Sequence, residues 1–318
     1  MDFTALNTVI LTLFVIMAIG FLCRKVKVID DVASKKMAKI ILAIGQPAML
    51  IYSLSSAEYS EENVKLACTM IVAGFIFHAL LALIAFFVAL PLKKIPDDRK
   101  VTEFALIFAN CAFIGFPIFD AVLPGKGLFM ASFLVVSFNV LLWTWGLAIY
   151  ARNRSDVKIT IRKVLVNFGT IPCLIGFVLF LLKNPAISFD IPEFFTKSAQ
   201  YLMNLCTPIS LLVTGALIAT QKPKKIFTTW HLYYFNVVKL FVLPLLVCLI
   251  AKLIRLPEPY GIFFTIAAAL PSAASTTMMS EEYDVSPVYA SLAVGTSSLL
   301  AVLTIPLTLS IAQYILSL

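Results

Sequence analysis

Charged residues are scarce in this sequence. Only 13% of its 318 residues are Asp, Glu, Lys or Arg, whereas 61% are apolar and the mean hydropathy is +0.97. Soluble domains average roughly a quarter charged residues and about half apolar ones, so this composition excludes a soluble α/β or other globular domain. Apolar runs of about twenty residues recur along the chain, and each can cross about 30 Å of hydrocarbon as a helix. The composition therefore predicts an all-α membrane protein.

Patterns that bind metals or catalyse reactions are also missing. The six cysteines stand singly, with no Cys-x-x-Cys pair, so we expect no disulfide framework, no metal site and no cofactor. The apolar runs hold no pair of aspartates and a single histidine, His78, which leaves an intramembrane enzyme as a remote alternative. No basic stretch precedes residues 3–23, so we expect them to be a retained span rather than a cleaved signal peptide.

The apolar runs predict ten transmembrane helices. Basic residues give a formal net charge of +8, but they cluster between the runs, which is typical of cytoplasmic loops facing anionic lipid and not of a nucleic-acid groove. The predicted spans are residues 3–23, 34–55, 63–90, 102–122, 126–150, 162–182, 195–220, 228–252, 260–280 and 285–316.

The distribution of Lys and Arg predicts the orientation. Eighteen of the 25 lie between spans 1 and 2, 3 and 4, 5 and 6, or 7 and 8; six lie on the opposite side, and Lys239 lies within a span. Since basic loops stay in the cytoplasm, we expect a multi-pass protein of the cell membrane with both termini outside. The loop between spans 9 and 10 is acidic, and acidic residues count little in this rule.

Ten spans divide into two halves of five, residues 1–155 and 156–318. With an odd number of spans per half, the second half enters the membrane inverted, which is typical of secondary transporters. Matched prolines support this division: Pro47 and Pro208 interrupt spans 2 and 7, and Pro117 and Pro271 interrupt spans 4 and 9. Paired interruptions of this kind predict a binding site near the middle of the membrane.

The interruptions in spans 4 and 9 carry the chemistry of the predicted site. We expect helix breaks at Gly115–Pro117 and at Leu270–Ser272, so that two broken helices cross and direct half-helix N-termini, with their unpaired N–H groups, at one place. Such a place suits a carboxylate. The candidate substrate-binding residues are Asn110, Gly115, Pro117, Asn139, Pro271, Ser272, Ser275 and Thr276.

Two titratable residues lie within spans. His78 and Lys239 are 161 residues apart (239 − 78), as are Pro47 and Pro208 (208 − 47), so they are candidates for equivalent positions in the two halves. A charged lysine inside a membrane costs about 2.5–3.5 kcal/mol on insertion scales. Both residues are therefore candidates for tuning the charge of the site or for proton exchange, while snorkelling of Lys239 and a backbone hydrogen bond from His78 are the structural alternatives.

Several motifs resemble the auxin efflux carrier family, which includes plant PIN-FORMED carriers and bacterial permeases of malate and malonate type. Residues 110–117 are similar to its Asn-x4-Gly-x-Pro motif, and Leu270–Pro271 with the Glu-Tyr-x-Val-x-Pro sequence at 282–287 is similar to its second crossover motif. Residues 47–50 resemble its Pro-x-Leu-Leu, and Asn139 falls where plant carriers have glutamine.

This resemblance implies a scaffold of spans 1, 2, 6 and 7, often forming a homodimer, and a moving transport unit of spans 3–5 and 8–10. It also implies an elevator motion and contact between Asn110 and the substrate carboxylate. The small polar residues from Ser272 to Thr277 depart from plant carriers and favour a smaller, more polar substrate. The expected function is transport of a small organic anion; a channel-like uniporter and a cation-coupled symporter of the bile-acid type are alternatives.

Overall fold

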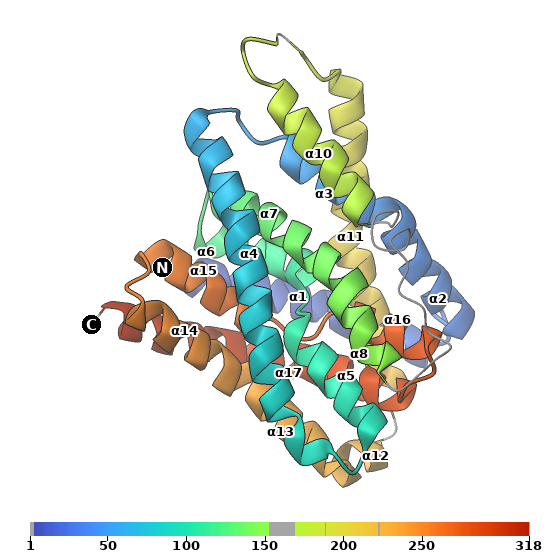
Figure 1. Cartoon of the computed structure of the whole chain (residues 1–318). Helices are drawn as coiled ribbons and strands as arrows, with labels where there is room; N and C mark the ends of the chain where they lie inside the picture. The colour runs from blue at the N-terminus through green and yellow to red at the C-terminus, as the bar shows by residue number, and fades with distance from the viewer. Residues whose placement is uncertain (1–2, 153–168, 188, 222, 318) are drawn as a thin grey trace.

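The computed structural model describes residues 3–152, 169–187, 189–221 and 223–317, and these residues are almost entirely helical (Figure 1). The helices in chain order are α1 (Phe3–Lys25), α2 (Asp31–Ile40), α3 (Gln46–Ser55), α4 (Glu61–Val88), α5 (Pro96–Ile107), α6 (Phe116–Val122), α7 (Gly127–Leu141), α8 (Leu147–Ala151), α10 (Thr170–Leu182), α11 (Glu193–Thr220), α12 (Pro223–Thr228), α13 (Trp230–Val237), α14 (Leu243–Leu253), α15 (Glu258–Ala269), α16 (Ser275–Glu282) and α17 (Pro287–Ser317). Four π-helical segments, η1 (Ile41–Gly45), η3 (Cys111–Gly115), η4 (Leu142–Gly146) and η5 (Val238–Val242), and a 3₁₀ turn, η2 (Leu90–Leu92), join or extend them.

Seven helical stretches among the described residues are long and apolar enough to cross a membrane. They are Thr4–Lys25, Asp31–Ser55, Glu61–Val88, Gly127–Ala151, Glu193–Thr220, Trp230–Leu253 and Pro287–Ser317. They coincide with predicted spans 1, 2, 3, 5, 7, 8 and 10. Predicted span 6 is represented by α10, because residues 162–168 lie outside the described residues, as do the basic residues Arg154, Lys158, Arg162, Lys163 and Lys222 and the boundary between the two predicted halves.

The prediction that Pro47 and Pro208 interrupt their helices is wrong. Pro208 lies inside α11, which runs without a break from Glu193 to Thr220. Pro47 lies in the first turn of α3, and the chain stays helical from Asp31 to Ser55 because the π-helical segment η1 precedes it. A π-helix pairs each carbonyl with the N–H five residues later, instead of four residues later as in an α-helix. This shift in pairing accommodates proline, which has no N–H, at position 47.

The predicted break in span 4 exists, but it lies earlier than expected. Helix α5 ends at Ile107, residues 108–110 leave the helical path, and η3 begins at Cys111. Gly115 and Pro117 lie where η3 continues into α6. The carbonyl of Phe113, which an N–H at position 117 would meet in an α-helix, instead accepts a 3.1 Å hydrogen bond from the Thr207 hydroxyl. The proline is therefore tolerated without a break.

The predicted break in span 9 is confirmed. Helix α15 ends at Ala269, and α16 begins only at Ser275, with Leu270–Ala274 between them. The two interrupted helices meet: Ala109 and Ser272 form an antiparallel bridge, the only β-type pairing in the part of the chain that the structure describes.

Helix α1 lies along α11, and α3 packs against α10 and α11; α4 packs against α5 and α7, and α14 and α17 pack against α15. Helix α17 also packs against α11, and α6 packs against α1. Figure 1 shows α3, α10 and the start of α11 together at one end of the molecule. Helices α1 and α11 approach closely because Gly20 lies against Leu212 and Gly215 lies against Met17.

Candidate functional site

Main-chain hydrogen bonds fix the point where the two interrupted helices cross. The Asn110 N–H donates to the carbonyl of Pro271 at 2.8 Å, and the Ala273 N–H donates to the carbonyl of Phe108 at 3.0 Å. Backbone groups freed by the helix breaks thus satisfy one another inside the protein, as a low-dielectric interior requires. The predicted crossing of spans 4 and 9 is therefore present, formed by residues 108–110 and 271–273.

Ser272 stabilises the crossing through hydrogen bonds and does not border a cavity. Its hydroxyl donates to the carbonyl of Ala105 at 3.0 Å, and its N–H donates to the hydroxyl of Ser297 at 3.2 Å. The residue is completely buried. Ser272 was predicted to contact substrate; the structure gives its polar atoms partners in α5 and α17 instead.

Asn110 occupies the first position of the second half of the broken span. Its side-chain Oδ1 accepts a 3.2 Å hydrogen bond from the Phe113 N–H, which makes it the N-cap of η3. This cap uses the amide oxygen and leaves the amide nitrogen for another partner. Asn110 also borders the cavity described next.

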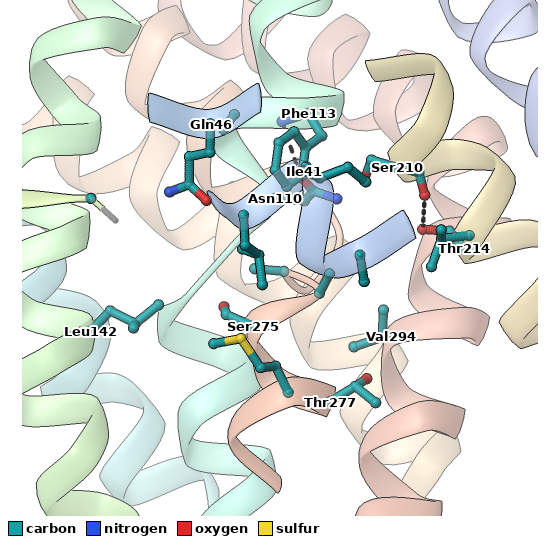
Figure 2. Close-up of a pocket in the computed structure, with 18 of the residues that line it drawn as sticks. Ile41, Gln46, Asn110, Phe113, Leu142, Ser210, Thr214, Ser275, Thr277 and Val294 are labelled. Atoms are coloured by element: carbon teal, nitrogen blue, oxygen red, sulfur yellow. Dashed lines mark hydrogen bonds between the residues drawn. The ribbon is translucent and has the colours of Figure 1, made fainter. Parts of the chain in front are cut away.

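A cavity of about 720 Å³ lies beside the crossing (Figure 2). Both half-helix starts border it, through Asn110, Cys111 and Ala112 on one side and Ala274 and Ser275 on the other. Its size falls within the range of roughly 300–1,000 Å³ common for small-molecule sites. The wall is largely apolar, with Ile41, Leu42, Phe113, Val135, Phe138, Leu142, Trp143, Val213, Leu217, Met278 and Val294 among its residues.

Two residues at the start of α16 that border the cavity, Ser275 and Thr277, have hydroxyl groups without a hydrogen-bond partner. Their oxygens, Ser275 Oγ and Thr277 Oγ1, are buried and unpaired among the described residues. Thr276 Oγ1 is also unpaired, but Thr276 is completely buried and does not border the cavity. Of the predicted residues, the structure therefore brings Asn110, Asn139 and Ser275 to the cavity, whereas Gly115, Pro117, Pro271, Ser272 and Thr276 do not border it.

Gln46, Ser210 and Thr214 are among the polar residues of the wall that were not predicted from the sequence. Gln46 precedes Pro47, and its Nε2 donates to Asn139 Oδ1 at 3.4 Å; Asn139 Nδ2 in turn donates to the carbonyl of Val135. Ser210 and Thr214 face the cavity from α11, where the Thr214 hydroxyl donates to the Ser210 carbonyl (Figure 2). An amide next to a proline within an apolar run was a signal for Gln46, but Ser210 and Thr214 have no local signal.

In the part of the chain that the structure describes, four charged residues border the cavity, and all four are exposed. They are Lys35 and Lys39, on α2, and Glu281 and Glu282, at the end of α16, and we take them to mark the mouth of the cavity. Deeper in, the lining polar groups are neutral amides and hydroxyls. A bound anion would therefore be held by backbone dipoles and neutral donors.

His78 and Lys239 are both buried and both lie outside the cavity wall. The Nδ1 of His78 is 2.8 Å from the Gly74 carbonyl and 3.4 Å from the Ser137 hydroxyl, so the imidazole has partners in its own helix and in α7. The Nζ of Lys239 donates to the carbonyl of Leu106 at 3.1 Å, one residue before the end of α5. Lys239 is completely buried and therefore does not snorkel to the surface.

No group of three or more His, Cys, Asp or Glu side chains that could hold a metal ion occurs within the described ranges. In α5, one turn before its end at Ile107, the buried Glu103 accepts from Arg99 at 2.8 Å and from Arg152 at 2.7 Å. The pair with Arg152 joins α5 to the end of α8, and none of these three residues borders the cavity.

The long apolar helices and the crossing of two interrupted ones define a multi-pass membrane protein with a cavity at the crossing. Comparison with protein families identifies it further: residues 6–309 match the family described as membrane transport protein, and the chain belongs to that family, which includes the auxin efflux carriers. It is therefore a membrane transporter and not an enzyme. A comparison with curated proteins finds no match.

Proposed function

We propose that this protein is a secondary transporter that carries a small organic anion, with the carboxylate bound at the crossing of the two interrupted helices. One observation carries the proposal: a cavity of about 720 Å³ is bordered by both half-helix starts and by Ser275 and Thr277, whose buried hydroxyls have no partner among the described residues. Helix N-termini and neutral hydroxyl donors together are a site for a carboxylate.

In this proposal an inverted repeat relates the two interrupted helices that form the crossing. Phe108 and Leu270, the residues at which the two helices break, are 162 positions apart (270 − 108), close to the 161 between His78 and Lys239. Pro117 and Pro271 are only 154 apart (271 − 117), so the breaks themselves, and not these prolines, correspond in the two halves. Two halves of five spans, with the membrane crossed ten times, agree with this spacing.

The division into a scaffold and a transport unit, which the family implies, is the basis of the proposed elevator motion. The group of α1, α2, α3, α10 and α11 corresponds to the scaffold implied by the family, and the remaining helices form the transport unit that carries the crossing. The cavity lies between them, because Gln46, Ser210 and Thr214 come from the scaffold group and Asn110, Asn139 and Ser275 from the other. Sliding of the second group would move the bound substrate across the membrane. We also propose a homodimer formed through the scaffold, as the family implies.

The cavity wall favours a substrate with one carboxylate and an apolar body. Among the described residues, the deeper lining offers Phe113, Phe138 and Trp143 but no cation for a second carboxylate. The expectation of a small, very polar substrate relied on the residues from Ser272 to Thr277. Of these, Ser275 and Thr277 are the polar residues that border the cavity, so that expectation has little support in the structure.

The cavity mouth indicates which side is open. Lys35 and Lys39 belong to the basic stretch 24–39, which the distribution of Lys and Arg assigns to the cytoplasm. With both termini outside, the cavity opens to the cytoplasm. The structure then represents an inward-facing state of the transport cycle.

The test is binding followed by counterflow. Purified protein would be screened by thermal unfolding against organic acids, and the best acid would be used as labelled substrate in proteoliposomes. Accumulation driven by unlabelled substrate inside the vesicles is expected of a carrier and is absent from a channel. Repeating the assay with imposed sodium or proton gradients separates a uniporter from a cation-coupled symporter. If cations but no organic acid raise the melting temperature, the organic-anion assignment is wrong.

A further inference from the structure

Lys239 is a buried cation without an ionic partner. Its side chain is completely buried in η5, and among the described residues no carboxylate forms a salt bridge with it. Its hydrogen bond runs to the carbonyl of Leu106, at the C-terminal end of α5. A helix C-terminus carries a partial negative charge of roughly half an electron, so this location stabilises an ammonium group.

The helix dipoles at the crossing cancel one another. Two half-helices begin there, at Cys111 and Ser275, and two end there, at Ile107 and Ala269. With roughly half a positive charge at each start and half a negative charge at each end, the four partial charges sum to about zero. The dipoles therefore orient an anion but supply no net charge to balance it. Lys239 adds one full positive charge to this region.

Lys239 lies close behind the cavity wall. The carbonyl of Leu106, which accepts its 3.1 Å hydrogen bond, lies three residues before Ala109, and Ala109 borders the cavity next to Asn110. The ammonium group thus does not border the cavity itself, but its charge acts on the position beside Asn110 through the buried interior, where screening is weak.

We propose that Lys239 is the fixed counter-cation of the crossing and that its single charge restricts the cavity to monoanions. The inference rests on the proposed function, because it concerns the charge of the substrate bound at the same site. A monoanion neutralises Lys239, a neutral molecule leaves the buried charge unbalanced, and a dianion adds an unbalanced negative charge. Both mismatches are costly in a low-dielectric site.

The experiment compares three probes with the same six-carbon skeleton at pH 7. Hexanoate is a monoanion, hexanamide is neutral and adipate is a dianion. Binding of each to the purified full chain would be measured by calorimetric titration. We expect the wild-type protein to bind hexanoate more tightly than either of the others. In Lys239→Met and Lys239→Gln, the preference for hexanoate over hexanamide is expected to fall roughly ten- to thirtyfold, the effect of one unit charge at moderate distance.

Three variants separate charge from structure. Glutamine at position 239 retains a donor for the Leu106 carbonyl, so loss of preference in this variant is due to charge even if Lys239→Met does not fold. Lys239→Arg retains the charge and is expected to retain the preference. Lys252→Met is the matched control, because Lys252 also donates to a carbonyl at a helix end, that of Ile315 at 2.7 Å, but does not border the cavity or the crossing.

The outcomes distinguish this inference from the function on which it rests. An unchanged preference for hexanoate in both neutral variants, or tighter binding of adipate than of hexanoate by the wild type, overturns the role of Lys239 and leaves an anion transporter. If none of a wider set of organic anions binds to the wild type, the proposed function itself fails.

Discussion

Asn110 and Pro271 are joined by a 2.8 Å hydrogen bond between main-chain atoms, although more than 150 residues separate them in sequence. This bond and the bond from Ala273 to Phe108 join the two interrupted helices through main-chain atoms, and the Ser272 hydroxyl adds a bond to the carbonyl of Ala105. The side chains of Asn110 and Ser275, which border the cavity, take no part in these bonds. This is why a substitution of a cavity residue can change binding without disrupting the crossing, and the predictions below depend on that separation.

Asn110→Asp is expected to separate capping from binding. Aspartate accepts the Phe113 N–H as well as asparagine does, so the free energy of unfolding should change by less than about 0.5 kcal/mol. Its negative charge beside the cavity should weaken binding of hexanoate by roughly tenfold or more. Thermal unfolding and calorimetric titration measure the two effects. Binding equal to that of the wild type would reduce Asn110 to a helix cap.

Ser275→Ala and Thr277→Val are expected to weaken anion binding. Each hydroxyl lacks a partner in the empty protein, so its removal should leave thermal stability equal or slightly higher. Loss of a hydrogen bond to a charged group costs about 1.5–3 kcal/mol, which corresponds to roughly ten- to a hundredfold in the dissociation constant. Thr276→Val is the control, because Thr276 is unpaired and buried on the same helix but does not border the cavity. Equal losses in all three variants would refute a specific role for the cavity hydroxyls.

Gly215→Ala is expected to destabilise the protein by several kcal/mol. A Cβ atom at position 215 would lie 1.9 Å from the carbonyl oxygen of Met17, and since that atom is backbone, α1 and α11 must separate. Gly261→Ala is the matched control: its Cβ would lie 3.1 Å from Leu316 Cδ1, the movable end of a side chain. Alanine favours a helix over glycine by about 1 kcal/mol, so this control should be neutral or stabilising. Melting temperatures in detergent measure both, and similar values for the two variants would contradict the close packing of α1 and α11.

Linking Gln46 to Asn139 is expected to stop transport. Their side chains meet at 3.4 Å across the boundary between the proposed scaffold and the proposed transport unit, so an elevator motion must separate them. In a background without the six native cysteines, Gln46→Cys with Asn139→Cys would be joined by a short bifunctional thiol reagent. Counterflow should fall to the level of empty vesicles and return when a cleavable linker is reduced.

The control for this experiment is a pair of residues within the proposed scaffold. Asn184 Nδ2 donates to the Tyr59 hydroxyl at 2.9 Å; Asn184 directly follows α10, and Tyr59 lies in the segment that follows α3. The same reagent on Tyr59→Cys with Asn184→Cys should leave counterflow unchanged. Full transport by the linked Gln46–Asn139 pair would rule out a sliding motion between these two units.

The sequence identified a site without locating all of its parts. Asn110, Asn139 and Ser275 were chosen because polar residues are rare in apolar runs, and they do border the cavity. Thr276 and Ser272 were chosen for the same reason but do not border the cavity. Only one side of α16 faces the cavity, and Ser272 lies inside the crossing. Ser210 and Thr214 resembled ordinary membrane-helix hydroxyls and were missed, since their exposure to the cavity depends on how α11 is turned.

The positions of the prolines likewise did not suffice to predict where the helices break. Proline removes a single N–H, and the effect depends on whether another donor takes the orphaned carbonyl. Thr207 does so for Phe113, and the chain continues past Pro117 as a helix. At Phe108, where the chain has no proline, the helix breaks because residues 108–110 find partners at 271–273. The break is caused by pairing and not by a residue that cannot be helical.

The sequence by itself determined that this chain lies in a membrane as long apolar helices, because the length and apolarity of a run are local properties. It also determined that spans 4 and 9 are interrupted. Only the tertiary structure decided where the fourth span breaks, which side chains border the cavity and what Lys239 contacts. These features depend on groups more than a hundred residues away, whose positions are fixed only when the helices pack.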